Sequence, residues 1–157
     1  MFKKWIYLLK TVALPLLVGL LCGLIIRKDT ELYDVLIRPP FALPGNLFSV
    51  VWTVLFLLMG VALYLFRKQT QNTSSGTEGT LLFFIQLFLN FLWPIVFFKF
   101  RMFFVAFLLL ILLFVFIVLT ISAFYRQNRV SGILLLPYAI YVAYAGYLNL
   151  AIWILNM

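Results

Sequence analysis

The 157-residue chain has no histidine, one cysteine and only four acidic residues. Without histidine there is no imidazole to serve as a general base or a metal ligand, and the lone Cys22 can form neither an intrachain disulfide nor a thiolate cluster. Charged residues make up 10% of the chain, whereas soluble domains carry about 25%. These absences exclude a conventional acid–base or nucleophilic catalytic set, predict no metal site and exclude a water-exposed globular surface.

Apolar residues make up 66% of the chain and are concentrated in five continuous stretches. A membrane-spanning helix needs about 20 apolar residues, and it satisfies its backbone hydrogen bonds within itself. A membrane barrel would show short alternating segments instead. The sequence therefore predicts an all-α membrane protein, a bundle of five transmembrane helices in a single domain covering residues 1–157. The helices are expected at about 5–26, 47–66, 80–98, 103–125 and 132–155.

The net charge of +8 arises from 12 basic residues that lie mostly at the ends of these stretches. Such residues meet lipid headgroups and set topology, so the charge does not indicate a nucleic-acid partner. The basic residues divide almost evenly between the two sides, and orientation stays open. One side has Lys3, Lys4, Arg67, Lys68, Arg126 and Arg129, and the other has Arg27, Lys28, Arg38, Lys99 and Arg101.

The connection over residues 27–46 is long for a helical bundle and is rich in proline, acidic and aromatic residues. It contains Tyr33, Phe41 and Pro44, and its aromatic content argues against disorder. We expect it to be structured and to form a lid over a pocket between the helices. The polar connection at 69–79, in contrast, is predicted to be mobile.

Three predicted helices place aromatic and polar residues on shared faces. Phe48 and Trp52 share a face of the second helix, and Tyr141, Ala145 and Leu148 share one of the fifth. In the third helix, Gln86, Asn90, Trp93 and Phe97 lie within about 60° of one another. The two amides have two interpretations, as hydrogen-bonding contacts between helices or as ligand-binding groups. Pro94 removes the N–H that would bond the Asn90 carbonyl, which would free that oxygen for another partner.

These segments together resemble the TspO family, also called the translocator protein or tryptophan-rich sensory protein family. The family's first loop and second helix follow a pattern like W-Y-x-x-L-x-K-P-x-W-x-P-P-x-x-x-F-x-x-V-W, read here from Leu32 to Trp52. The third helix resembles Q-L-x-L-N-x-x-W-x-x-x-F-F from Gln86 to Phe98. The fifth resembles L-L-x-P-Y-x-x-W-x-x-x-A-x-Y-L-N from Leu134 to Asn149.

Several positions depart from the family pattern. Leu32, Phe41 and Tyr141 stand where the family has tryptophan, and Leu43 replaces the first proline of the P-P pair. Some members dimerise through small residues of the third helix. This chain has neither glycine nor alanine between Thr80 and Phe98, which argues against that close-packed seam in the homodimer that the resemblance implies and leaves the dimer interface open.

The resemblance implies an integral membrane protein of the bacterial cell membrane that binds porphyrins, haem or aromatic drug-like molecules and needs no cofactor of its own. It leaves three functions open: a receptor or sensor, an enzyme that degrades protoporphyrin in light, and a carrier of tetrapyrroles or sterols. Trp52 and Tyr141 are the candidate redox residues for the enzyme. The candidate ligand-binding residues are Tyr33, Phe41, Pro44, Phe48, Trp52, Gln86, Asn90, Trp93, Tyr141, Ala145 and Leu148.

Overall fold

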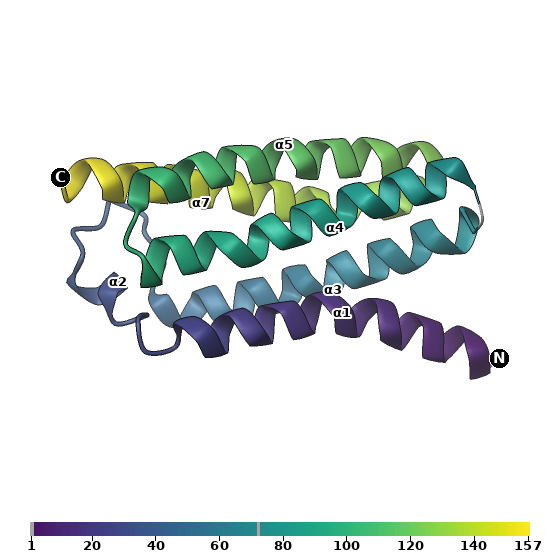
Figure 1. Ribbon diagram of the computed structural model, residues 1–157, viewed down its shortest axis with the longest axis horizontal. Coiled ribbons are helices and arrows are strands. Elements are labelled where there is room, and N and C mark those ends of the chain that lie inside the picture. The colour runs from purple at the N-terminus through teal and green to yellow at the C-terminus, as the bar shows by residue number, and fades with distance from the viewer. Residues whose placement is uncertain (1, 72) are drawn as a thin grey trace.

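The computed structural model describes residues 2–71 and 73–157, and within them every side chain except those of residues 2, 3 and 46. Within these ranges, five long helices run along the long axis of the molecule (Figure 1). All five are long and apolar enough to cross a membrane, so the predicted five-helix architecture is confirmed. They are α1 (Phe2–Ile26), α3 (Gly45–Gln69), α4 (Ser74–Pro94), α5 (Phe103–Gln127) and α7 (Leu136–Leu155).

Among the described residues, three short elements lie in the connections between the long helices. The helix α2 (Leu32–Val35) lies in the first connection, and the π-helical turn η1 (Ile95–Lys99) follows α4. The helix α6 (Arg129–Ile133) precedes α7, so the last predicted span, 132–155, begins within α6 and continues through α7. Pro137 stands in the first turn of α7, where proline has no hydrogen bond to lose.

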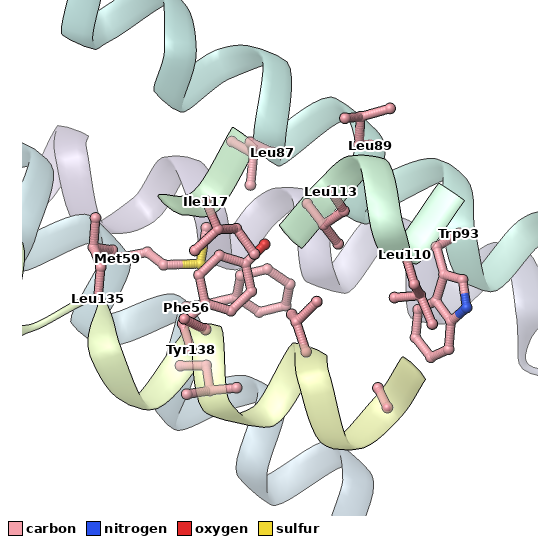
Figure 2. Close-up of a cluster of buried hydrophobic side chains, with 14 of the residues drawn as sticks. Phe56, Met59, Leu87, Leu89, Trp93, Leu110, Leu113, Ile117, Leu135 and Tyr138 are labelled. Carbon is pink, nitrogen blue, oxygen red and sulfur yellow. The ribbon is translucent and has the colours of Figure 1, made fainter. Parts of the chain in front are cut away.

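The helices pack as two groups, with α1 against α3, and α5 against both α4 and α7 (Figure 1). The core between the groups is apolar, and Figure 2 shows Phe56 and Met59 of α3 beside Tyr138 of α7 and Ile117 of α5. Large apolar side chains such as Leu17 and Phe88 lie on the outer faces, where lipid can cover them.

The segment at 69–79 differs from the prediction, because α4 already begins at Ser74. Thr73 caps the helix by accepting a hydrogen bond from the Gly76 N–H at 3.0 Å. A Cβ atom at Gly76 would clash with the Thr70 carbonyl, and one at Gly79 would clash with the Phe66 ring. Composition suggested a mobile linker, but here the glycines allow two helices to meet closely.

The third helix was predicted to run to residue 98, but α4 ends at Pro94. Because proline has no N–H to bond the carbonyl four residues earlier, the chain widens into η1. The Phe100 N–H then donates to the Ile95 carbonyl at 3.1 Å. This wider turn ends at Lys99 and borders the cavity described below.

Candidate functional site

A cavity of about 600 Å³ lies between α1, α3, α4 and α7, at the end of the bundle where the first connection crosses. Ligand pockets typically measure about 300–1,000 Å³. Seven of the candidate ligand-binding residues line this cavity: Tyr33, Phe48, Trp52, Asn90, Trp93, Ala145 and Leu148.

The other four candidates do not line the cavity. Phe41 is 88% exposed, and Pro44 is the exposed residue that precedes the first turn of α3. Gln86 is fully buried against Tyr138, away from the cavity. Tyr141 packs behind Trp52, with ring centroids 5.5 Å apart and planes at 86°.

The backbone explains why Phe41 points outward. The Ala42 N–H donates to the Pro39 carbonyl, and Phe41 has a φ of 68°, as at the third position of a type II turn. That position favours glycine, because an L side chain is rarely accommodated there. The turn directs the Phe41 ring to the surface, and only its carbonyl takes part in the packing of the loop.

Trp52 is the centre of the aromatic cluster beside the cavity. Its ring lies 5.7 Å from Phe56, 6.2 Å from Trp93 and 6.2 Å from Tyr138, measured between ring centroids. Tilted and edge-on contacts at these distances are favourable for aromatic rings. The cluster gives the cavity a rigid aromatic wall built from three helices.

Tyr138 connects the two amides of α4 to α7. The Asn90 amide donates to the Tyr138 hydroxyl at 2.7 Å, and that hydroxyl donates to the Gln86 carbonyl oxygen at 2.8 Å. Both amides therefore join helices, and of the two only Asn90 also lines the cavity. The Gln86 amide nitrogen is buried and has no partner among the described residues.

A second buried contact holds Trp93 in place. The Trp93 indole N–H donates to the Asn149 side-chain oxygen at 2.9 Å. The Asn149 amide in turn donates to the Phe103 carbonyl at 2.7 Å, which links α4, α5 and α7. Because its N–H is already bonded, Trp93 can offer a ligand only its apolar faces.

The first connection is fastened over this end of the bundle by one side chain of α7 and by the residue that caps its C-terminus. Tyr144 donates to the Phe41 carbonyl at 2.8 Å and accepts from the Leu43 N–H at 3.2 Å. Asn156 clamps Ile37, accepting from its N–H and donating to its carbonyl, each at 3.0 Å. Sequence analysis did not assign these two residues a role, because their partners lie 101 to 119 positions away.

Within the connection, Tyr33 is the side chain that reaches inward. It is buried, its ring lies 5.4 Å from Phe48, and its hydroxyl donates to the Leu43 carbonyl at 3.1 Å. Burial raises the pKa of the Tyr33 phenol, an effect that the nearby Arg38 partly opposes. The phenol is therefore neutral at physiological pH and closes the cavity without adding charge.

Sequence analysis missed the whole wall formed by α1, together with further lining residues such as Phe56, Phe91 and Asn149. Cys22 and Gly23 both line the cavity, and the Cys22 thiol donates to the Phe91 carbonyl at 3.6 Å. A Cβ atom at Gly23 would meet nothing within 4 Å, so the space beside this cavity-lining glycine is open. Leu20 and Leu24 line the cavity and are more than half exposed, so it reaches the surface beside α1.

The chemistry of the lining is apolar and uncharged. Among the described residues that line it there is no aspartate, glutamate, lysine or arginine, and their polar groups are amides, hydroxyls, indole N–H groups and the Cys22 thiol. The described residues contain no cluster of three or more side chains that could hold a metal ion. This arrangement can bind an apolar molecule and orient it with a few polar groups, but it offers no acid–base pair.

The sequence of this chain matches a known family of proteins. A family model described as the TspO/MBR family matches residues 11–154, nearly the whole chain. The chain belongs to the TspO/MBR family. Like its family, it is an integral multi-pass membrane protein, with five helices able to cross the bilayer.

Relatives of this TspO/MBR chain occur in bacteria and in mammals. The "Tryptophan-rich protein TspO" of Chlorobaculum tepidum is 39% identical over 124 residues, covering 79% of this chain and 78% of that protein. The "Tryptophan-rich sensory protein" of Cereibacter sphaeroides is 31% identical, covering 85% and 82%. The "Translocator protein" of Bos taurus is 30% identical over 155 residues, covering 98% and 92%. The similarity therefore extends over the helices that build the cavity.

Proposed function

We propose that this protein is a membrane receptor or sensor that binds a flat hydrophobic molecule, with protoporphyrin or haem as the expected class. The observation that carries the proposal is the cavity of about 600 Å³ with Trp52 and Trp93 in its wall and no charged side chain in its lining. Aromatic faces favour a planar apolar ligand, and Asn90 and Tyr33 are polar groups that can orient it. The names of the relatives, which include a sensory protein and a translocator protein, agree with such a role.

Filling the cavity without disturbing the fold tests this proposal. Gly23 and Gly146 are matched positions, because a Cβ at either one meets nothing within 4 Å, yet only Gly23 lines the cavity. We expect Gly23→Leu to weaken protoporphyrin binding about tenfold or more, since the new side chain occupies ligand space. Gly146→Leu should bind like the unchanged protein.

Binding is measured by titrating protoporphyrin into the detergent-purified protein and following the porphyrin absorbance and tryptophan quenching. Trp52→Ala provides a second measurement, because it removes an aromatic face from the cavity wall. Unchanged affinity in both Gly23→Leu and Trp52→Ala would show that the ligand does not occupy this cavity.

Light-dependent porphyrin oxidation is a second candidate function, supported by the contact between Trp52 and Tyr141. The centroids of their rings are 5.5 Å apart, and Trp52 itself lines the cavity. A porphyrin in the cavity would therefore contact the oxidisable ring of Trp52, with the oxidisable ring of Tyr141 directly behind it. Illumination of the complex in air separates this activity from binding alone. Bleaching faster than that of free porphyrin in detergent, and slowed in Tyr141→Phe, would support the enzyme, and equal rates would exclude it.

A further inference from the structure

A second, smaller cavity of about 230 Å³ lies between α1, α3 and α4. Its lining residues belong to the opposite end of the bundle, the end at which Figure 1 marks the N-terminus. We call this cavity the basic crevice. Its polar end is formed by Tyr7, Lys10, Arg67 and Thr80, and Leu63 and Phe84 are among its apolar walls. None of these residues lines the candidate ligand-binding cavity.

Arg67 is held across three helices by neutral groups. Its Nε donates to the Tyr7 hydroxyl of α1 at 3.3 Å, and its Nη1 donates to the Thr80 hydroxyl of α4 at 3.2 Å. A guanidinium has five N–H donors, so these two bonds leave donors available. Among the described residues Arg67 has no carboxylate partner, and the charge of this partly buried side chain is not neutralised.

Lys10 brings a second positive charge to the same crevice. The candidate membrane span of α1 begins at Lys4, and Lys10 lies six residues further on, about 9 Å along the helix axis. Its ammonium forms no ion pair within the described part of the chain. Lys10 and Arg67 thus bring two cations to one crevice near the end of the helices, where an anionic lipid headgroup can pair with them.

The protein itself supplies little negative charge at this end. Glu78 is the one acidic residue of the chain outside the first connection, and its side chain is exposed. It forms no ion pair with any residue that the structure describes. No described carboxylate pairs with Lys10 or Arg67, so an anion at this crevice would come from outside the chain.

The apolar walls of the crevice indicate which kind of anion would fit there. Beyond the cations, Leu63 and Phe84 continue the crevice as an apolar surface. A molecule that fits has an anionic head and a hydrocarbon tail, and the membrane itself supplies such molecules. Basic pockets between transmembrane helices are known to bind the headgroups of anionic lipids, and phosphate forms strong charge-assisted hydrogen bonds with guanidinium groups.

We propose that the basic crevice binds an anionic phospholipid, with its phosphate between Lys10 and Arg67 and an acyl chain along Leu63 and Phe84. The site is independent of the ligand-binding cavity. By bridging α1 to α3 and α4, the bound lipid would fasten α1 at the end where Arg67 already joins these helices.

The test compares two double variants that remove the same charge from the same end of the protein. Lys10→Gln with Arg67→Gln removes both cations of the crevice, and Arg126→Gln with Arg129→Gln removes two cations outside it. Lipid binding is measured by native mass spectrometry of the detergent-purified protein titrated with phosphatidylglycerol or phosphatidylcholine. We expect the crevice variant to lose about tenfold in phosphatidylglycerol affinity, while the control stays close to the unchanged protein.

A single variant and a competition with phosphate complete the test. Lys10→Gln alone should fold normally, because Lys10 is exposed, and it should still weaken phosphatidylglycerol binding. Inorganic phosphate at millimolar concentration should not displace the lipid, since it cannot occupy the apolar wall. Equal losses in both double variants, equal binding of phosphatidylcholine, displacement by phosphate, or an unaffected Lys10→Gln variant would each overturn the proposal.

Discussion

At the scale of single residues, the Tyr138 hydroxyl is the most connected polar atom of the core. It is fully buried and serves Asn90 and Gln86 at once. We expect Tyr138→Phe to lower the free energy of unfolding by about 1–2 kcal/mol, because both amides lose a partner while remaining buried. Chemical unfolding in detergent measures the change. Tyr147→Phe is the control on the same helix, since Tyr147 is 48% exposed and should change stability by less than about 0.5 kcal/mol.

At the scale of elements, the junction between α3 and α4 depends on glycine. A Cβ at Gly76 would meet the Thr70 carbonyl, which belongs to backbone and cannot move aside easily. We expect Gly76→Ala to destabilise the protein by about 1–3 kcal/mol through overpacking. Gly146→Ala, where a Cβ has open space, should instead be neutral or slightly stabilising. Thermal unfolding of the two variants in one detergent compares them, and similar melting temperatures would argue against a close junction.

The first connection offers another prediction at this scale, because each of its tethers holds a different amide. Asn156→Ala should speed hydrogen exchange at Ile37 about fivefold, the equivalent of about 1 kcal/mol for the lost bond. Tyr144→Phe should do the same at Leu43. Each variant controls for the other in exchange measurements resolved to single amides. Acceleration spread equally over both residues in both variants would indicate that the connection opens as one unit.

At the scale of the whole molecule, an odd number of crossings fixes how the termini lie. Figure 1 places the N- and C-termini at opposite ends of the bundle, as five spanning helices require. A reporter fused to the N-terminus and one fused to the C-terminus should therefore lie on opposite sides of the membrane. The nearly even division of basic residues does not determine which side is which. Reporters on the same side would contradict the five-helix topology.

The sequence alone determined the five spans and much of the site. A bilayer demands helices of a minimum apolar length, so composition is enough to locate them within a few residues. Helical spacing was enough to place Asn90 and Trp93 on one face of α4, because residues three and four apart share a face, and both line the cavity. Local patterns of this kind are visible in any short stretch of the chain.

Only the tertiary structure decided the rest. In α1, lipid-facing and cavity-facing positions are equally apolar, so the sequence could not show that Cys22 and Gly23 line the site. Phe41 matched an aromatic position of the family pattern, yet a local turn sends its ring outward. The tethers from Tyr144 and Asn156 join residues more than a hundred positions apart. Such contacts depend on how helices are placed side by side, which no periodicity within one helix can specify.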